Sequence, residues 1–361
     1  MRKMRLGRML SALLLSAALA GCGGPKAPES GTPANGGAAG APGGKSGGKP
    51  IRAALVLDTG GRDDKSFNAA AYEGIERAEK ELGVEAHDLE SKDASDYQSN
   101  LTRFASEGYD VVFAVGFAME DALKAVAPQF PNVKFAIVDG NAPDAPNCAA
   151  LQFREEQGSF LVGYLAGAMS KTKTIGFVGG LDIPLIHKFE AGYRAGAKTA
   201  DPNVKVIAAY TGDWNDVNKG KSQAMQLIGN GADILYQAAG KAGLGAIQAA
   251  KEKGPGYYAI GVDRDQDDEA PGRVLTSMVK RVDNAVYDTI KRVKEGRFQP
   301  GVQLYDLKSD GVGLSAMKYT KQEVPAETLA RLEKIKKMIA DGQIVPPTTV
   351  EAVATFQPPK L

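Results

Sequence analysis

The sequence predicts an α/β protein built from two similar lobes, and three observations support this prediction. From Ile51 almost to the end of the chain, continuous apolar runs of strand length alternate with helical patterns. Such alternation is typical of parallel sheets that are covered by helices on both faces. One β-α-β unit occurs in two copies along the chain. The length of 361 residues also suits two domains of roughly 150 residues each.

The apolar runs define the expected strands, and the segments between them define the expected helices. The strands are expected at Ile51–Leu57, Val84–Asp88, Val111–Val115, Lys134–Val138, Thr174–Val178, Val204–Tyr210, Ile234–Gln237 and Tyr257–Val262. The helices between them include Ala69–Leu82, Tyr97–Glu107, Gly158–Met169, Lys219–Gly229 and Leu244–Lys253.

The two copies of the repeat run from Asp110 to Asp139 and from Asp233 to Asp263. Each copy starts with an aspartate after a glycine-containing turn and ends with an aspartate just past an apolar strand. Ligands of open parallel sheets bind outside the carboxyl ends of the strands. If the lobes face each other, Asp139 and Asp263 accept hydrogen bonds from ligand hydroxyls, such as a sugar diol, in a shared cleft. The alternative for each aspartate is a helix cap or a turn.

The loop that follows the first strand, from Asp58 to Asn68, also lies at a strand carboxyl end. Phe67 is a large aromatic residue in this polar loop, next to a helix N-terminus. It either staples the helix to the core or offers a flat face to a ligand. Asn68 can donate and accept hydrogen bonds, which suits the edge of a heterocycle.

Two further aromatic residues follow strands of the second half of the chain. Trp214 lies in a loop after the strand Val204–Tyr210, and Phe189 follows the strand Thr174–Val178. One aromatic ring from each lobe would sandwich a planar ligand, with stacking worth about 0.5–1.5 kcal/mol beyond the buried area. Packing between the lobes is the alternative role for both residues.

Residues 1–21 are expected to be a targeting segment rather than part of the fold. Four basic residues precede a short apolar run from Met9 to Ala18, which is too short to span a bilayer. The run ends in Leu19-Ala20-Gly21-Cys22, which resembles the lipobox of a bacterial lipoprotein. Cleavage would then precede Cys22 and this cysteine would be acylated. The alternative is an ordinary secretory signal followed by a coincidental cysteine.

Residues 22–50 are expected to be the acylated cysteine and a flexible tether. They are rich in Gly, Pro, Ala and Ser and contain almost no large apolar residue, so they cannot bury enough surface to fold. Loss of the four basic residues would change the net charge from +1 to about −3, which does not suit a nucleic-acid binder. With Cys22 acylated, Cys148 would be a free, buried thiol.

A set of motifs, taken in order, resembles the basic membrane protein family. These proteins are lipoproteins that serve as substrate-binding components of ABC importers, and well-studied members bind purine nucleosides. The resemblance runs from about Ile51 to near the carboxyl end. Beside the lipobox and Val138-Asp139, the motifs are Asp64-Lys-Ser-Phe-Asn68, Phe189-Glu-Ala-Gly-Tyr193, Gly212-Asp-Trp214, Gly261-Val-Asp263-Arg-Asp-Gln266 and Ser277-Met-Val-Lys-Arg-Val-Asp283.

The resemblance implies a type I periplasmic-binding-protein fold, in which three crossover segments join two Rossmann-like lobes. These segments are expected near Ala149–Phe153, Thr276–Arg281 and Leu304–Val312. The first lobe would contain residues 51–150 and 281–308, and the second lobe residues 151–280 and 309–361.

The resemblance also implies roles for individual residues. The base would lie between Phe67 and either Trp214 or Phe189, and its edge would contact Asn68 and Asp58. Asp139 and Asp263 would take the ribose hydroxyls, and Gly240 would allow close backbone approach. Lys280 would reach the cleft from a crossover, although a solvated lysine beside Asp283 is the alternative.

No motif indicates an enzyme, a cofactor or a metal site. His87 and His187 are isolated from each other and from cysteines, and there is no Gly-x-Ser-x-Gly elbow. The stretch Gly240–Gly245 lacks the spacing of a phosphate-binding loop. The acidic stretch Asp263–Glu269 lacks the central glycine and final glutamate of an EF-hand.

Taken together, the targeting segment and the resemblance predict a monomeric, membrane-anchored, extracytoplasmic substrate-binding protein of an ABC importer. It would close by hinge rotation around a purine nucleoside and present it to permease and ATPase subunits, with contact to the membrane through the lipid only and no contact with nucleic acid. Riboflavin or a sugar is the alternative ligand, and a sensor that presents ligand to a membrane receptor is the alternative role.

Overall fold

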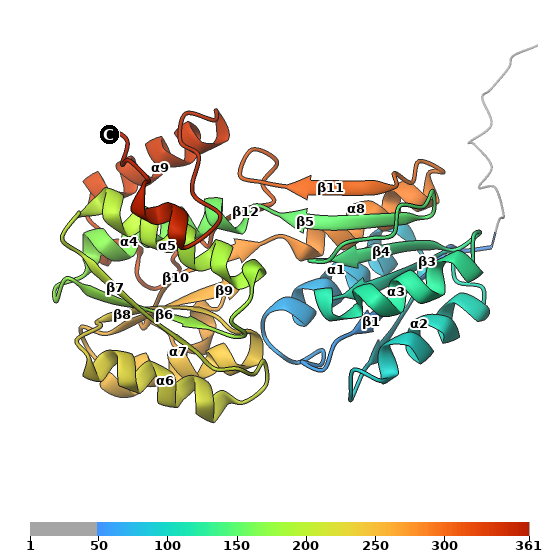
Figure 1. Ribbon diagram of the computed structural model, residues 1–361, viewed down its shortest axis with the longest axis horizontal. Helices are drawn as coiled ribbons and strands as arrows, with labels where there is room; N and C mark the ends of the chain where they lie inside the picture. The colour runs from blue at the N-terminus through green and yellow to red at the C-terminus, as the bar shows by residue number, and fades with distance from the viewer. Residues whose placement is uncertain (1–48, 361) are drawn as a thin grey trace, which may run out of the picture. The chain divides into compact units, whose positions relative to one another are not determined.

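The computed structural model describes residues 49–360, which form two α/β lobes, each built on a six-stranded sheet (Figure 1). The strand orders are β11-β5-β4-β3-β1-β2 in the first lobe and β12-β10-β9-β8-β6-β7 in the second. The predicted α/β class with two similar lobes is therefore confirmed. The predicted signal segment 1–21, the acylation site Cys22 and nearly all of the tether lie outside the described residues.

The first lobe contains an all-parallel sheet with helices on both faces. Alternate strand residues point to opposite faces, so Leu55 and Phe113 pack under one helix pair while Val56 and Val112 pack under the other. Its strands are β1 (Arg52–Leu57), β2 (Glu85–Glu90), β3 (Val111–Val115), β4 (Lys134–Val138), β5 (Cys148–Phe153) and β11 (Gly301–Tyr305). Its helices are α1 (Phe67–Leu82) and α8 (Val282–Lys294) on one face, and α2 (Asp96–Ser106) and α3 (Glu120–Val126) on the other.

The second lobe repeats this plan, except that its last strand is antiparallel. Its strands are β6 (Thr174–Gly179), β7 (Lys205–Tyr210), β8 (Ile234–Ala238), β9 (Tyr258–Asp263), β10 (Val274–Lys280) and the antiparallel β12 (Val312–Leu314). Its helices are α4 (Glu155–Met169), α5 (Pro184–Ala200), α6 (Val217–Gly229), α7 (Leu244–Lys253) and α9 (Ala326–Ala340). Figure 1 shows α4 and α5 on one face of the sheet and α6 and α7 on the other.

Three segments carry the chain between the lobes: one after β5, one between β10 and α8, and one between β11 and β12. Backbone hydrogen bonds tie them together, from Arg154 N to Tyr305 O and from Arg281 N to Gly311 O. The strand β5 pairs within the first sheet as far as Phe153, so the chain leaves the first lobe later than the expected boundary at 150.

The segments expected only as crossovers also contribute strands. The strand β10 precedes the second crossover, β11 and β12 lie before and after the third, and all three complete the two sheets. His187 was expected in a loop but lies on helix α5, which also carries Phe189. Pro184 occupies the first turn of this helix, where its fixed backbone angle and missing N–H are tolerated. In the described part of the chain, no helix is long and apolar enough to cross a membrane.

The contact between α4 and α5 depends on glycine. A Cβ at Gly196 would lie 2.0 Å from the carbonyl oxygen of Phe160, so Gly196→Ala forces the two helices apart. We expect this variant to lose about 1–3 kcal/mol of unfolding free energy, measured by urea denaturation. The matched control is Gly229→Ala at the end of α6, where a Cβ would meet no atom within 4 Å and alanine favours the helix. Equal stability of the two variants would contradict this account.

Candidate ligand-binding site

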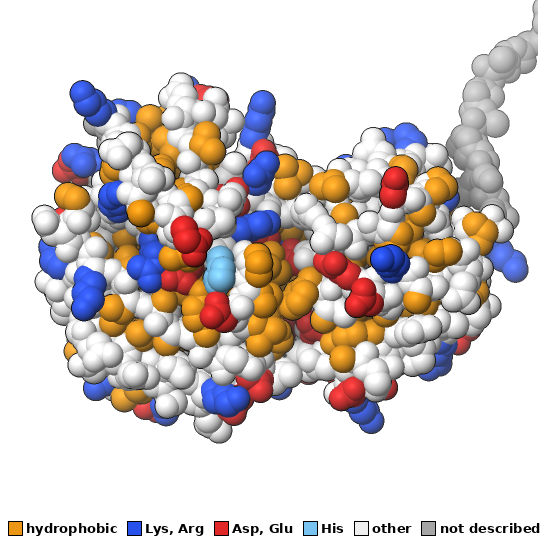
Figure 2. All heavy atoms as spheres, viewed as in Figure 1, with side chains coloured by type: hydrophobic (Ala, Val, Ile, Leu, Met, Phe, Trp, Pro, Cys, Tyr) orange, Lys and Arg blue, Asp and Glu red, His pale blue; other side chains and the backbone are white. Residues whose placement is uncertain are grey.

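A cavity lies between the two lobes, at the carboxyl ends of β1, β3, β4, β6, β8 and β9. Figure 2 shows the groove between the lobes, with apolar side chains on its walls and acidic side chains within it. The structure brings together in this cavity all the site residues that the sequence predicts: Asp58, Phe67, Asn68, Asp139, Phe189, Trp214, Gly240, Asp263 and Lys280.

Asp64 organises the wall that the first lobe contributes. Its buried carboxylate accepts hydrogen bonds from the backbone N–H groups of Ser66, Asn68 and Ala69, so it caps the first turn of α1. This cap fixes Phe67 and Asn68 at the edge of the cavity. Burial raises the pKa of Asp64 to about 7, against the lowering effect of these backbone hydrogen bonds.

Asn68 and Asp58 form a second fixed pair on the same wall. The Asn68 side-chain amide donates to Asp58 Oδ1 at 2.7 Å, and the backbone N–H of Gly60 donates to the same oxygen at 2.8 Å. Burial raises the pKa of Asp58, while these two hydrogen bonds oppose the rise. Because the amide nitrogen is used in this way, Asn68 Oδ1 is left buried and without a partner.

Asp139 and Asp263 occupy equivalent places, one directly after β4 and one as the last residue of β9. Both have a left-handed backbone, with φ of 62° and 65°, a conformation that aspartate tolerates better than most residues. The shared conformation aims both strand ends at the cavity. Asp263 Oδ2 accepts a hydrogen bond from Ser66 Oγ of the other lobe at 2.5 Å, whereas Asp139 Oδ1 has no partner.

Lys280, the last residue of β10, is buried in the cavity wall with 1% of its side chain exposed. Its ammonium bonds to Asp139 Oδ2 and lies 3.4 Å from Glu155 Oε1. The structure therefore pairs Lys280 with Asp139 rather than leaving it solvated beside Asp283. Burial disfavours the charged lysine, yet Asp139, Glu155 and Asp263 together raise its pKa above the ordinary value.

The titration of Asp139 reflects the same cluster. Burial raises its pKa, Lys280 lowers it, and the charges of Glu155 and Asp263 add to the rise, with a net value of about 6. For Asp263, burial again raises the pKa, and Lys280 and the Ser66 hydroxyl oppose the rise. The cavity thus holds carboxyl groups whose charged form would be stabilised by a hydrogen-bond donor of a ligand.

Aromatic rings from both lobes border the cavity. Phe67 from the first lobe and Phe189 from the second lie 5.3 and 5.4 Å from the Lys280 ammonium. Trp214 lines the same cavity and packs against two glycines: a Cβ at Gly180 would lie 2.1 Å from its ring, and Gly240 has a φ of 56° beside it. Both lobes thus contribute aromatic rings to the lining of the cavity.

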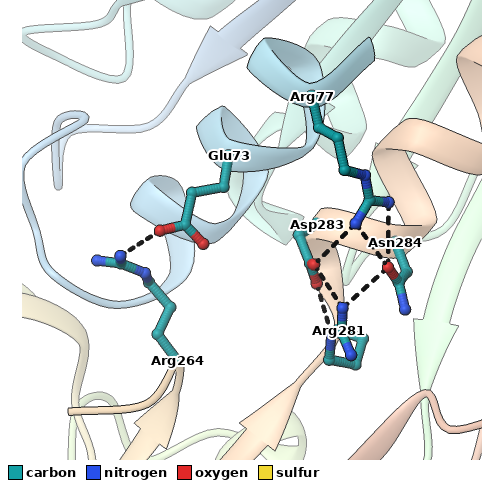
Figure 3. A network of polar contacts seen from close by, with 6 residues as sticks. All are labelled: Glu73, Arg77, Arg264, Arg281, Asp283 and Asn284. Carbon is teal, nitrogen blue, oxygen red and sulfur yellow. Dashed lines mark hydrogen bonds and ion pairs between the residues drawn. The ribbon is translucent and has the colours of Figure 1, made fainter. Parts of the chain in front are cut away.

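Direct contacts across the groove hold the lobes together. Asn215 donates to Thr59 O at 3.1 Å, and Gln266 donates to Lys65 O at 2.9 Å. Figure 3 shows the ion pair between Glu73 of α1 and Arg264 after β9, next to a cluster in which Arg77 of α1 contacts Asp283 and Asn284 beside the second crossover. These contacts join the first lobe to the second.

Several lining residues were missed by the sequence analysis. Asp64 lay inside a quoted motif but was not assigned a role, although an aspartate two to five residues before a helical segment is a capping signal. The side chains of Phe117, Leu185, Ile186 and Lys241 complete the lining, and no local pattern marks them. Glu155, which lies 3.4 Å from Lys280 but does not line this cavity, was also missed, although it is only two residues past the end of β5.

Acidic side chains of the stretch after β9 bond to other residues of this chain, so they are not free metal ligands. Asp267 accepts from the backbone N–H of Lys318 at 2.7 Å, and Asp268 contacts the ammonium of Lys318 and the hydroxyl of Tyr319. Over residues 49–360, no three His, Cys, Asp or Glu side chains are arranged to hold a metal ion.

Two lobes whose strand ends border one polar and aromatic cavity define a protein with a small-molecule site between its lobes. The model of the Bmp family, described as ABC transporter substrate-binding protein PnrA-like, matches residues 51–347, and the chain belongs to this family. It is thus a substrate-binding protein of an ABC transporter, in a family without enzymatic activity, and its partners are a small-molecule ligand and transporter components.

Known relatives and structures agree with this assignment. The chain is 34% identical over 318 residues to the ABC transporter nucleoside-binding protein BmpA of Lactococcus lactis subsp. cremoris, covering 82% of this chain and 89% of that protein. It is 38% identical over 355 residues to an uncharacterized lipoprotein of Pyrococcus abyssi, covering 94% of this chain and 83% of that protein.

The solved structure of an ABC transporter solute-binding protein from Aeropyrum pernix K1 has a TM-score of 0.79 and 30% identity. The match covers 85% of this chain and 96% of that one. The predicted type I periplasmic-binding-protein fold is confirmed by this and more distant structural neighbours.

The raised pKa values predict an unusual dependence of stability on pH. A carboxyl whose pKa is about 7 in the folded protein and near 3.9 in the unfolded chain favours folding most at low pH, and this contribution is lost as the pH rises through 7. We therefore expect the ligand-free protein to melt several degrees lower at pH 8 than at pH 5, because Asp64 and Asp139 act in the same direction.

Asp64→Asn should reduce this fall in melting temperature, since asparagine also caps helices but does not titrate. Asp93→Asn is the control: this exposed carboxylate accepts from Ser95 N, its pKa is lowered by that hydrogen bond, and it stays ionised between pH 5 and 8. A fall that is unchanged in Asp64→Asn would show that Asp64 does not carry the effect.

Proposed function

We propose that this protein captures a purine nucleoside between its lobes and delivers it to an ABC permease for import. The observation that carries the proposal is the combination of aromatic faces with unpartnered, buried acceptor atoms in one cavity. Asn68 Oδ1 and Asp139 Oδ1 lack partners, so a ligand that supplies hydrogen-bond donors would satisfy them. A nucleoside offers both a planar ring and hydroxyl donors.

The base is assigned to the space between Phe67 of the first lobe and the rings of Phe189 and Trp214 of the second. Phe67 and Phe189 both border the Lys280 ammonium, which favours Phe189 as the nearer opposing face. The pair Asn68 and Asp58 lies directly beside Phe67, where it would meet the polar edge of the base.

The ribose is assigned to the aspartates at the two strand ends. Asp139 Oδ1 is free to accept a hydroxyl proton, and Asp263 offers the oxygen that Ser66 does not occupy. Hydrogen bonds to a charged acceptor contribute about 1.5–3 kcal/mol each, enough to separate a nucleoside from a free base. Gly240, with its left-handed backbone, leaves room beside Trp214 for the ligand.

The lobes would close on the nucleoside by rotation about the three crossovers, and the permease would recognise the closed pair of lobes. A relative that bears the name nucleoside-binding protein supports this choice of ligand. Attachment to the outer face of a membrane through acylated Cys22 is part of the proposal, and it is supported by a relative that is named a lipoprotein.

A thermal-shift panel on the purified protein tests the ligand. Inosine, guanosine or adenosine at about 1,000 times the dissociation constant should add about 4 kcal/mol to stability and raise the melting temperature by several degrees. Free purine bases and ribose should have little effect, because each engages only part of the cavity. A shift with riboflavin or a sugar alone would keep the fold and overturn the proposed ligand.

A preparation that responds to nothing must first be extracted under denaturing conditions, because a tightly bound ligand would mask any shift. Recovery of a nucleoside from the extract would support the proposal. Recovery of another compound would replace the nucleoside with that compound.

Asp139→Asn and Asp263→Asn test the ribose contacts. We expect each to weaken nucleoside affinity at pH 7.5 by about tenfold or more, measured by calorimetry, since a charged acceptor is lost. Each should also reduce the preference for inosine over 2′-deoxyinosine or 3′-deoxyinosine. Asp268→Asn is the control, because this exposed carboxylate contacts Lys318 and does not line the cavity. Wild-type affinity in both cavity variants would exclude the assigned ribose site.

A further inference from the structure

Glu155, the first residue of α4, is a buried carboxylate to which neither the sequence analysis nor the proposed ligand contacts give a role. Only 1% of its side chain is exposed, and it follows directly after the first crossover. It lines a second cavity, which shares Asp139 with the ligand cavity and is also lined by Asn141 and Gln152. A buried carboxylate in this position needs compensating partners.

Two lysines supply this compensation. The ammonium of Lys280 lies 3.4 Å from Glu155 Oε1, and the ammonium of Lys188 donates to Glu155 Oε2 at 3.3 Å. Lys188 is the neighbour of Phe189 on α5. Glu155 therefore connects the end of β10 with the helix that carries one of the aromatic faces.

Lys280 is shared between two carboxylates that reach it from opposite lobes. It bonds to Asp139 Oδ2 from the first lobe and faces Glu155 Oε1 from the second, and Phe67, Phe153 and Phe189 surround it with rings 5.0–5.4 Å from the ammonium. An ammonium has three donors, and aromatic faces are weaker partners for them than carboxylates. The direction of the ammonium thus depends on the balance between Asp139 and Glu155.

We propose that Glu155 is a positioning residue for ligand binding: it draws the Lys280 ammonium away from Asp139 Oδ1, so that this oxygen stays free for the ligand. The structure shows the expected result of this balance, because Lys280 bonds only to Oδ2 and Oδ1 has no partner. Without Glu155, Asp139 is the one carboxylate of the described residues left in an ion pair with the ammonium, whose free donors then turn to both of its oxygens.

The charges around Asp139 and Glu155 also support this positioning role. Asp139 is faced by Lys280, Glu155 and Asp263, and Glu155 is faced by Lys280 and Lys188 and adjoins Glu156. Burial is the main cause that raises the pKa of Asp139, and the negative charge of Glu155 adds to it. Removal of that charge should therefore lower the pKa of Asp139 and strengthen its bond to Lys280.

Glu155→Gln tests the proposal, with Glu156→Gln as the matched control. Glu156 is the next residue of α4 and is also buried, but it lies 3.6 Å from Arg154 and contacts neither Lys280 nor the ligand cavity.

The first measurement uses the ligand-free, full-length protein: the carboxyl carbon of Asp139 is followed by NMR from pH 4 to 8 and assigned with Asp139→Asn. We expect Glu155→Gln to lower the pKa of Asp139 by about one unit, because the negative charge of Glu155 is one of the causes that raise it. Glu156→Gln should leave it near the wild-type value.

The second measurement is inosine affinity by calorimetry, and only this choice of probe rests on the proposed function. At pH 7.5 we expect Glu155→Gln to bind about tenfold more weakly and Glu156→Gln to bind as the wild type does. An unshifted Asp139 titration in Glu155→Gln overturns the proposal. A shifted titration with wild-type affinity overturns it too, because the free oxygen would then not depend on Glu155.

Equal losses of affinity in both glutamine variants would indicate a purely structural role for this turn of α4 and would also overturn the proposal. If the wild-type protein binds no nucleoside, the proposed function fails. The titration of Asp139 in the ligand-free variants then decides the positioning role without any ligand.

Discussion

The buried ammonium of Lys280 is the constraint on which the rest of the site depends. A charge with 1% exposure is tolerable only where opposite charges meet it, and these come from Asp139 at the end of β4 and from Glu155 at the start of α4. One partner belongs to the first lobe and the other to the second. Neutralising this lysine therefore brings the end of β4 in the first lobe against the start of α4 in the second. The same cluster leaves one carboxylate oxygen of Asp139 without a partner. The charges that neutralise the buried lysine therefore also leave an acceptor for a hydrogen-bond donor of a ligand.

The parallel sheets explain why the other site residues meet at all. All carboxyl ends of a parallel sheet lie along one edge, and two such edges facing each other bring the loops after β1, β4, β8 and β9 into one cavity. Asp139 and Asp263 share a left-handed backbone, so the two copies of the repeat also have the same backbone conformation at their final aspartate. The two lobes line the cavity with different residues. The first lobe contributes Phe67 and the capped turn at Asp64, and the second contributes Phe189 and Trp214.

Residues whose position follows from local pattern were predictable from the sequence. The strands β3 and β4 begin and end at the expected residues, because short apolar runs between polar turns leave little freedom of assignment. Asp139 and Asp263 followed from the repeat, and Phe67 from its unusual place in a polar loop. The strands β5 and β10 to β12 were expected only as crossover segments, because their pairing partners are fixed by where the chain crosses between lobes. Glu155 was not predicted as part of the site for a similar reason: its partners Lys280 and Lys188 are distant in sequence, and no periodicity links them.

The contacts across the groove indicate how a ligand would shift the balance between open and closed forms. Several of them lie at the rim, such as Asn215 with Thr59 and Glu73 with Arg264, and exposed contacts of this kind contribute little, about 0–1 kcal/mol each. The bond from Ser66 to Asp263 is buried and stronger, yet it uses only one oxygen of the aspartate. The buried ion pair of Lys280 with Asp139 is the other strong direct contact between the lobes. A ligand that bonds to Asp139 and Asp263 together interacts with both lobes at once, and it does so only when they are closed. That differential interaction, rather than the strength of any single contact, is what would drive the closed form.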